Sequence, residues 1–388
     1  MKKDKLIIAG AGSGKTTHLV TMALSCQEGK VLITTYTEAN EAEIKDAILR
    51  KHRYVPSNVT VQTWFSLLLQ HGVRPYQGSL HRMLFRKEIA GMLLVNQTSG
   101  VKYRTSKGVP VCYKESEEFE DHYFSPSMRI YSDKISKFIS KANEATSGEV
   151  ISRLSRLYAH IFVDEVQDLA GYDLELLSSL FRTDSNILLV GDPRQVTYLT
   201  HHERKYGKYT NGKIKDFILN EVPKRFRPEI DETTLNVSHR NPAEICSYAA
   251  KLYPRLVPTV PCQCHTCRGI ESNSHIGVFL VKPKDVDSYL REYRPMQLRW
   301  DMRRIVNQGY PVRNFGEAKG CTFERVLIYP TEPMEQWIRN NTFDLKNETR
   351  AKLYVGITRA RMSAAMVLDF IDDVRVEGIQ KYNAERTG

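Results

Sequence analysis

Short apolar runs alternate with helical stretches along most of the chain. An apolar run at residues 5–8 is followed by a Gly-rich turn and by an amphipathic stretch at 15–26, whose spacing predicts a helix. Near-continuous apolar strands between helices are typical of a parallel sheet covered on both faces. The pattern therefore predicts an α/β fold. The further strands expected in this part are 31–34, 59–61, 161–163 and 187–190, with helices at 39–50 and 174–181.

A segment of different character interrupts this pattern. Residues 71–157 are rich in Lys, Arg, Tyr and Ser, and their apolar spacing is mostly helical, as in 132–145. We therefore expect a first domain formed by residues 1–70 and 158–230, with a mainly α insertion at 71–157. A second α/β pattern predicts a further domain at 231–388, with a short insertion around 255–275. Its expected elements are a helix at 241–252, strands at 277–281 and 326–329, and an apolar run at 364–368.

Composition narrows the class of protein. The 388 residues include 56 Lys and Arg against 45 Asp and Glu, a net charge of +11, which favours a polyanionic partner. No apolar run approaches the ~18 residues of a membrane span, and no basic amphipathic terminal helix favours a membrane surface. A hydrophobic fraction of 41% excludes a mostly disordered chain. Seven cysteines, an odd number, do not indicate a disulfide scaffold, so we expect a reducing compartment such as the cytoplasm of a bacterial or virus-infected cell.

A phosphate-binding loop is indicated directly after the first strand. Glycines allow backbone N–H groups to curl around an anion, and the N-terminus of the following helix adds the positive end of its dipole. In this pattern Lys15 reaches the β and γ phosphates, and the Thr16 hydroxyl holds Mg²⁺. The alternative is an ordinary Gly-rich turn. The loop reads Ala9, Gly10, Ala11, Gly12, Ser13, Gly14, Lys15 and Thr16, followed by Thr17.

Two acidic residues follow the strand expected at 161–163. Asp164 is suited to binding Mg²⁺ through water, and Glu165 to polarising the water that attacks a phosphate. A solvated acidic loop is the alternative for this pair alone. Because a phosphate-binding loop and a carboxylate pair belong to one expected sheet, hydrolysis of a nucleoside triphosphate is the favoured interpretation.

At this point the sequence resembles the UvrD/Rep-like superfamily 1 helicases. The likeness rests on several motifs in family order across nearly the whole chain, which together are more specific than any one. Besides 9–16 and 164–168, they are Thr35-Tyr36-Thr37, Thr63-Trp64-Phe65-Ser66, Gly191-Asp192-Pro193-Arg194-Gln195 with Tyr198, Ser238-His239-Arg240, Lys319-Gly320 with Phe323, and Leu353-Tyr354-Val355-Gly356-Ile357-Thr358-Arg359-Ala360.

This resemblance implies two RecA-like domains that hydrolyse ATP, with Mg²⁺, in the cleft between them while single-stranded DNA lies across both. Glu165 and Gln195 would act on the attacking water and the γ-phosphate, and Arg240 and Arg359 would act as arginine fingers. The substrate would be single-stranded or tailed duplex DNA with 3′→5′ polarity, and a replication, repair or defence protein is a further expected partner. The expected nucleic-acid contacts are Tyr36, Thr37, Thr63, Trp64, Phe65 and Tyr198, although Trp64 could equally belong to the core.

The sequence differs from that family at the position that stacks on the base of the nucleotide. His239 stands where the family commonly has the tyrosine that stacks on adenine, and an imidazole can still stack there. The stretch between Arg240 and Lys319 is too short for the large accessory domain of many relatives. The chain therefore resembles a minimal motor.

Two questions stay open at this level. Cys262, Cys264 and Cys267 include a Cys-x-x-Cys pair with His275 downstream, which is either a zinc site or a loop without metal. The motor itself is either a translocase or helicase, or a nucleic-acid-stimulated ATPase switch in a larger complex without processive unwinding. A non-catalytic binding module is disfavoured because each expected catalytic residue is present, and RNA is an alternative to DNA as the track.

Overall fold

The computed structural model describes residues 4–197, 205–268, 275–371 and 376–384. Contacts divide the chain into two compact units. The first comprises Met1–Leu6, Thr16–Gly191 and Leu199–Ile230, and the second comprises Ile7–Lys15, Asp192–Tyr198 and Asp231–Gly388. Most of the phosphate-binding loop and residues 192–197 are thus grouped with the C-terminal part of the chain.

The first sheet has six strands in the order β10-β1-β9-β8-β2-β3. β2 pairs in parallel with both β3 and β8, and β8 pairs in parallel with β9. Five of these six strands agree with the apolar runs of the sequence to within one or two residues, and β10 was not expected from the sequence. Their bounds are β1 Lys5–Ile8, β2 Val31–Thr35, β3 Val59–Thr63, β8 His160–Val163, β9 Asn186–Gly191 and β10 Glu229–Asp231, and the associated helices are α1 Lys15–Ser25, α2 Glu38–His52, α3 Trp64–Leu67, α7 Tyr172–Leu180 and α8 Ile214–Glu221.

Helix α2 shows how local sequence sets the ends of an element. The Thr37 hydroxyl caps its N-terminus by accepting from the Asn40 N–H at 3.1 Å. Arg53 ends the helix in the left-handed region with φ 71°, and its N–H donates to the Leu49 carbonyl. Acidic residues in the first turn and basic residues in the last turn complement the helix dipole.

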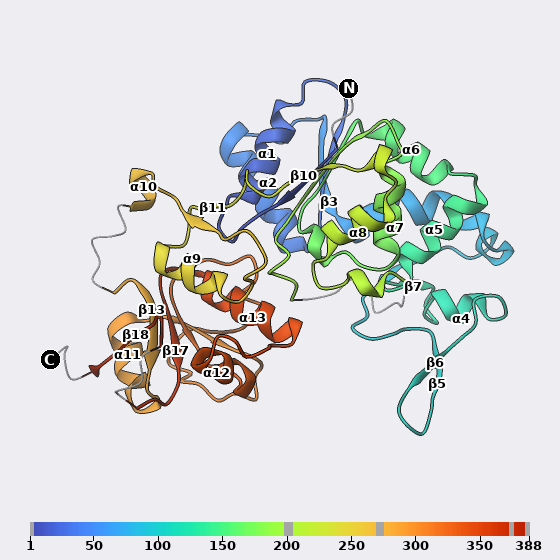
Figure 1. The fold of residues 1–388 in the computed structure, drawn as a ribbon. Helices are drawn as coiled ribbons and strands as arrows, with labels where there is room; N and C mark the ends of the chain where they lie inside the picture. The colour runs from blue at the N-terminus through green and yellow to red at the C-terminus, as the bar shows by residue number, and fades with distance from the viewer. Residues whose placement is uncertain (1–3, 198–204, 269–274, 372–375, 385–388) are drawn as a thin grey trace. The chain divides into compact units, whose positions relative to one another are not determined.

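The segment at 71–157 combines helices with short strands. α5 buries Ile135, Phe138, Ile139 and Ala142, and it packs against α7 and against the turn at Leu68–Val73. The strands pair as β4 with β7 and as β5 with β6, and the β5–β6 hairpin projects from the rest of the first unit (Figure 1). The bounds are α4 Phe119–Tyr123, α5 Ile135–Ala145, α6 Glu149–Leu157, β4 Gly91–Leu93, β5 Val101–Arg104, β6 Pro110–Cys112 and β7 Arg129–Tyr131.

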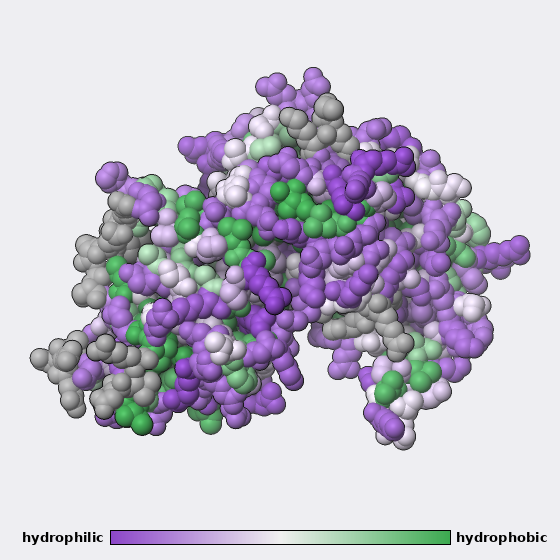
Figure 2. Space-filling model, viewed as in Figure 1, coloured by the Kyte–Doolittle hydropathy of each residue, from purple (hydrophilic) through white to green (hydrophobic). Residues whose placement is uncertain are grey.

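Hydrophilic side chains dominate the face of the molecule in Figure 2, with an apolar group at the β5–β6 hairpin. Val109, in the turn between these two strands, is 55% exposed. A single exposed valine at a hairpin tip is ordinary on a protein surface.

The second sheet is also six-stranded, in the order β15-β14-β16-β17-β13-β18, and each of its pairings is parallel. Alternate residues of its strands enter two separate hydrophobic clusters, as the two-residue repeat of a strand requires. Val278 and Leu280 pack on one side, and Phe279 and Val281 pack on the other. This is why the central strands read as continuous apolar runs.

Helices cover both clusters of this sheet. Tyr248 of α9 and Trp337 of α12 belong to one cluster together with Tyr354 of α13, and Tyr289 of α11 belongs to the other. The α/β class with two parallel sheets is therefore confirmed. The bounds are β13 Gly277–Val281, β14 Met296–Arg299, β15 Val312–Asn314, β16 Phe323–Ile328, β17 Ala360–Val367, β18 Gln380–Lys381, α9 Ala243–Ala250, α11 Val286–Tyr293, α12 Glu332–Arg339 and α13 Asn347–Thr358.

Candidate nucleotide-binding site

The predicted phosphate-binding loop lies between β1 and the N-terminus of α1. Gly12 and Gly14 have φ of 71° and 80°, the left-handed region that glycine adopts without strain. The Ser13 hydroxyl donates to the Gly10 carbonyl at 2.8 Å and closes the turn. The loop therefore has the glycine-dependent backbone that a phosphate cradle requires.

The segment that follows β10 fixes this loop through backbone hydrogen bonds. The Gly10 N–H donates to the Leu235 carbonyl at 2.7 Å, and the His239 N–H donates to the Gly12 carbonyl at 2.8 Å. A Cβ on Gly12 would lie 2.6 Å from the Cβ of Arg240. Gly12 is therefore required both by its backbone angle and by the close approach of Arg240.

Asp164 and Glu165 follow β8 as expected. Asp164 is 5% exposed, and its N–H donates to the Thr34 carbonyl at 2.8 Å. Glu165 has φ 52° and ψ 40°, a left-handed conformation that is uncommon for a residue with a side chain. Its carboxylate accepts a hydrogen bond from the Gln167 amide. Such backbone strain is often found at functional sites.

Oxygen donors suited to Mg²⁺ lie at the start of helix α1 and at the end of strand β8. A hard cation prefers hydroxyl, carboxylate and phosphate oxygens, and it keeps several water ligands. The hydroxyl of Thr16 at the start of α1 and the carboxylate of Asp164 at the end of β8 are donors of this kind. Thr16 and Asp164 are the residues that would hold Mg²⁺, and the ion would supply charge neutralisation for the phosphate oxygens of a nucleotide.

Directly after β9, a buried ion pair organises the residues that follow. Asp192 is 0% exposed and Arg194 is 4% exposed, and their charged groups are joined at 2.7 Å. Burial alone would lower the pKa of the Arg194 guanidinium, but the charge of Asp192, its hydrogen bond to Arg194 and the nearby Tyr354 and Tyr253 together outweigh burial and raise that pKa. Arg194 also donates to the carbonyls of Ala9 at 2.9 Å and Val257 at 3.1 Å.

Gln195 connects this ion pair to Arg359. Its amide donates to the second oxygen of Asp192 at 2.8 Å, and its carbonyl oxygen accepts from the Arg359 guanidinium. Gln195 and Arg359 are 2% and 3% exposed. The structure thus brings together two of the predicted catalytic residues, which are 164 positions apart in the sequence.

Arg240 approaches the same region from β11 (Val237–Ser238). Its guanidinium donates to the Thr358 carbonyl at 3.3 Å, directly before Arg359. Asn241 donates to the Thr358 carbonyl at 3.0 Å and to the Ala360 carbonyl at 2.7 Å. The end of α13 is therefore attached to the segment that holds the phosphate-binding loop.

Reasoning from the sequence assigned no role to several members of this network. Asp192, Arg194 and Tyr354 belong to motifs quoted for the family resemblance, and Asn241 follows Arg240 directly. The hydroxyl of Tyr354 lies 3.5 Å from Asp192, and burial raises the pKa of that hydroxyl. The spacing of Asp192 and Arg194, two residues apart after an apolar run, was the signal in the sequence that could have indicated the ion pair.

The expected nucleic-acid contacts lie at the ends of β2 and β3, but not all are accessible. Tyr36 is half-buried and its ring lies 5.5 Å from that of Phe65, which is 8% exposed. Thr37 and Thr63 accept hydrogen bonds that cap α2 and α3. Tyr198 lies outside the described residues.

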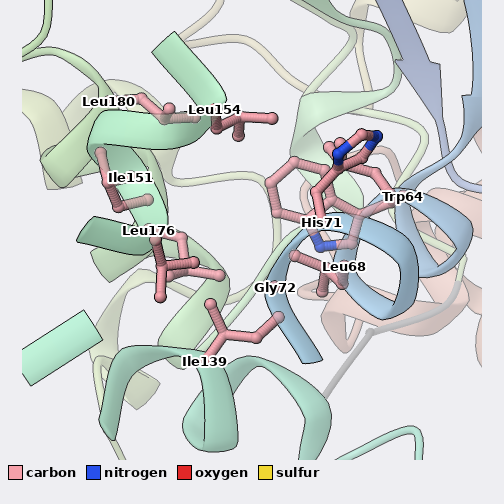
Figure 3. Close-up of a pocket in the computed structure, with 11 residues that line it drawn as sticks. Trp64, Leu68, His71, Gly72, Ile139, Ile151, Leu154, Leu176 and Leu180 are labelled. Atoms are coloured by element: carbon pink, nitrogen blue, oxygen red, sulfur yellow. The ribbon is translucent and has the colours of Figure 1, made fainter. Parts of the chain in front are cut away.

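Trp64 occupies the core, which is the alternative that the sequence left open. It is 2% exposed, and its indole N–H donates to Asp173 at 2.8 Å. Figure 3 shows its ring beside His71 in an apolar pocket of the first unit, lined also by Leu68 and Ile139. Burial lowers the pKa of the His71 imidazole, so His71 is neutral near pH 7. A buried ring of this kind is not available for stacking on a base in this conformation.

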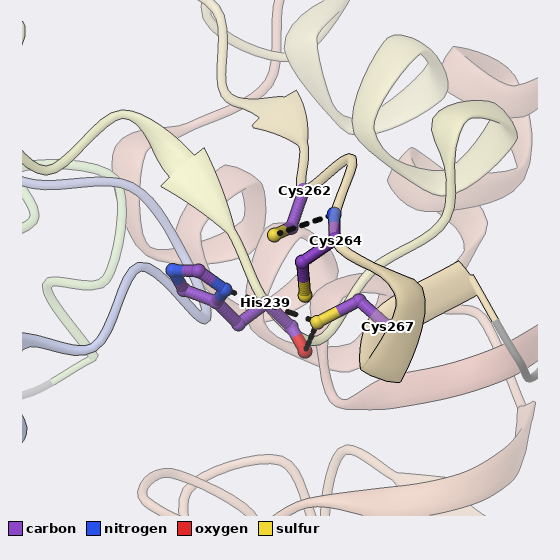
Figure 4. A group of neighbouring side chains, drawn as sticks. All are labelled: His239, Cys262, Cys264 and Cys267. Atoms are coloured by element: carbon purple, nitrogen blue, oxygen red, sulfur yellow. Dashed lines mark hydrogen bonds between the residues drawn. The ribbon is translucent and has the colours of Figure 1, made fainter.

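His239 and the three clustered cysteines also have defined places. His239 is exposed directly after β11. Its imidazole lies beside Cys267, at 3.8 Å between Nδ1 and Sγ (Figure 4). His275, expected near the cysteines, is instead buried between the rings of Phe279 and Tyr293, each with its centroid 3.8 Å away.

These features define an α/β protein with a nucleotide-binding P-loop. Residues 1–201 match the family described as an AAA domain, which is more than half of the chain, so the protein belongs to that family. A search of curated proteins finds no match. None of the helices within the described residues has the length and apolar character needed to cross a bilayer.

Among solved structures, the chain is similar to Arterivirus nonstructural protein 10 (helicase), both in complex with DNA and alone. Sequence identity is 16% in each comparison, and the TM-scores are 0.44 and 0.45. The alignments cover 95% of this chain but 62% and 60% of the viral chains. This chain therefore spans about three fifths of the length of these structures.

Proposed function

We propose that the protein hydrolyses ATP to move along single-stranded DNA in the 3′→5′ direction, as a translocase or helicase of superfamily 1. The observation that carries this proposal is a continuous path of hydrogen bonds. It runs from Arg359 through Gln195 to Asp192, and from Asp192 through Arg194 to the carbonyl of Ala9 in the phosphate-binding loop. A motor needs such a connection, because the state of the phosphate must alter the position of distant residues.

The proposed chemistry uses the side chains at this loop. Lys15 would stabilise the β and γ phosphates of ATP, and Glu165 would accept a proton from the attacking water. As the water oxygen bonds to the γ-phosphorus, the bond to the β,γ-bridging oxygen breaks and inorganic phosphate leaves. Arg240 and Arg359 would stabilise the negative charge of the transition state. Loss of the γ-phosphate would then release the guanidinium groups from their anionic partner.

The net charge of +11 supports a nucleic acid as the track. Tyr36, half-buried beside Phe65 at the end of β2, is a candidate for stacking on a base. The burial of Trp64 and Phe65 favours a second candidate function. With fewer rings to hold a separated strand, the protein could act as a nucleic-acid-stimulated ATPase switch within a replication, repair or defence complex.

ATP turnover by the purified chain, with and without single-stranded DNA, tests the proposal. We expect stimulation by DNA that is lost in Lys15→Ala and in Arg359→Ala. Arg339→Ala, which removes an exposed guanidinium on α12, is the matched control and should keep turnover. Absence of turnover in the unchanged protein, with or without DNA, would overturn the proposal.

Strand separation then distinguishes the two candidate functions. Duplexes with a 3′ or a 5′ single-stranded tail should be unwound from the 3′ tail by a translocating helicase. Stimulated turnover without unwinding of either duplex would favour the switch. The same assay with an RNA strand of equal sequence decides the chemistry of the track.

A further inference from the structure

Four metal-ligating side chains converge in the second unit. They are His239, Cys262, Cys264 and Cys267, and their candidate ligand atoms all lie within 4.8 Å of one another (Figure 4). A search of the described residues for three or more neighbouring His, Cys, Asp or Glu side chains that could hold a metal ion finds this group.

A short parallel ladder brings the two parts of the cluster together. β11 and β12 (Val260–Pro261) pair in register, with Ser238 opposite Pro261. The Cys262 N–H extends the ladder by donating to the Ser238 carbonyl at 2.8 Å. His239 and Cys262 are therefore neighbours because each directly follows a paired residue. Cys264 and Cys267 are added by the turn into the short helix α10 (His265–Arg268).

We propose that His239, Cys262, Cys264 and Cys267 bind one Zn²⁺ ion as a structural site. Zinc in such sites is tetrahedral, with Zn–S bonds near 2.3 Å, so sulfur atoms on one ion lie about 3.8 Å apart. The Cys267 Sγ and His239 Nδ1 atoms are already 3.8 Å apart. The remaining ligand atoms, within 4.8 Å, need to move by about 1 Å or less to complete a tetrahedron.

The donor set selects the metal and the kind of site. Three thiolates and one imidazole are soft and borderline donors that favour zinc over Mg²⁺ or Ca²⁺. Four protein ligands also fill the tetrahedron, as in structural rather than catalytic zinc sites. The three cysteines alone could not complete this shell. His239 supplies the fourth ligand from a segment distant in the sequence, whereas His275 is buried among aromatic rings.

Zinc at this position would fix a segment that contacts the phosphate-binding loop. The His239 N–H donates to the Gly12 carbonyl, and the next residue is Arg240, whose Cβ lies against Gly12. The ion would therefore hold the backbone of Arg240 in place through its neighbour. Any effect of the zinc ion on nucleotide turnover through Arg240 rests on the proposed function, whereas the metal site itself does not.

Metal content of the full chain tests the site directly. Protein purified with a non-chelating reductant, without added zinc, should contain about one zinc ion per chain by elemental mass spectrometry. Loss of a ligand should lower zinc affinity by more than about 100-fold, because removal of an outer-shell partner alone costs about 10–100-fold. We expect this loss in Cys264→Ser, whose exposed position makes misfolding an improbable cause, and in His239→Ala.

Two further variants make the result specific. Cys26→Ser lies outside the cluster and should keep the full zinc content. His239→Cys supplies a fourth thiolate and should restore zinc binding that His239→Ala loses. Replacement of zinc by Co²⁺ should give the visible spectrum of tetrahedral cobalt with thiolate ligands in the unchanged protein, and not in Cys264→Ser.

The outcomes separate the site from the proposed function. Unchanged protein that holds no zinc, or a different metal in its place, would overturn the proposal, as would equal zinc content in Cys264→Ser and Cys26→Ser. Protein that holds zinc but lacks ATP turnover would leave the site established and overturn the motor.

Discussion

Substitution of Arg194 by methionine is the most direct test of the buried ion pair. Methionine keeps much of the length of the side chain but removes the guanidinium. The change eliminates the ion pair with Asp192 and the hydrogen bonds to the carbonyls of Ala9 and Val257. Asp192, with 0% of its surface exposed, then lacks its opposing cation.

The expected cost follows from that burial. Removal of one partner from a buried ion pair typically lowers the free energy of unfolding by about 3–5 kcal/mol, because the remaining charge stays desolvated. For a unit of this size, 1 kcal/mol corresponds to about 2–4 °C in the melting temperature. We therefore expect the unit that contains Arg194 to melt roughly 6–20 °C lower in Arg194→Met.

A second substitution distinguishes loss of the pair from loss of side-chain volume. Asp192→Asn in the Arg194→Met background removes the isolated charge, so the double variant should be more stable than Arg194→Met alone. Thermal unfolding followed by circular dichroism measures both, with Arg339→Met as an exposed control. If Arg194→Met melts within 2 °C of the unchanged protein, or if the two substitutions destabilise additively, the ion pair does not organise this region as we describe.

Three other perturbations have defined outcomes. Gly12→Ala should weaken binding of a fluorescent ATP analogue more than tenfold, because the added Cβ meets a neighbouring side chain at 2.6 Å and φ is positive. His275, whose pKa burial and Arg325 lower to about 4, should make the protein less stable as pH falls below 6.5, by up to about 3 kcal/mol near pH 4. Trp64→Phe should lower the free energy of unfolding by about 1–2 kcal/mol in urea titrations, through loss of the hydrogen bond to Asp173.

Each has a contrary result, and the first two have a comparison variant. Gly108→Ala introduces similar backbone strain where no atom lies within 4 Å of the added Cβ, so equal loss of ATP binding in both glycine variants would contradict the clash. His275→Phe retains the ring stack and should reduce the dependence of stability on pH between 6.5 and 4. An unchanged dependence would exclude His275 as its source. Full stability of Trp64→Phe would show that the indole hydrogen bond contributes nothing.

Regular strands were predicted well because burial on both faces leaves a continuous apolar signal. The strand expected at 277–281 has these bounds in the structure, with alternate residues in two clusters. The helix expected at 241–252 is shorter, because Asn241 uses its side chain to bind the carbonyls of Thr358 and Ala360 and Pro242 precedes the first turn. Strands β4 to β7 were missed, since each has only three or four residues, mostly half-buried or exposed, and carries no clear alternation.

The P-loop was predictable because its chemistry is contained in eight consecutive residues. The role of Arg194 was not, since its partners Ala9 and Val257 are 185 and 63 residues away. Trp64 shows the same difficulty, because an aromatic residue after a strand fits both a base-stacking site and a core. A hydrogen bond to Asp173, 109 residues away, places it in the core. The UvrD/Rep-like assignment and the role of each catalytic residue stay predictions.

His239 has a role in both proposals, and its backbone contact and its side-chain contact can be tested separately. Its backbone N–H holds the Gly12 carbonyl, while its imidazole lies beside the Cys267 thiol. Any residue except proline preserves the backbone contact, so His239→Ala removes the metal ligand without removing the anchor of the phosphate-binding loop. If ATP turnover falls in His239→Ala and recovers in His239→Cys, the metal acts on the loop through this residue. If turnover falls in both, the imidazole ring itself serves the nucleotide, as the resemblance to base-stacking residues first indicated.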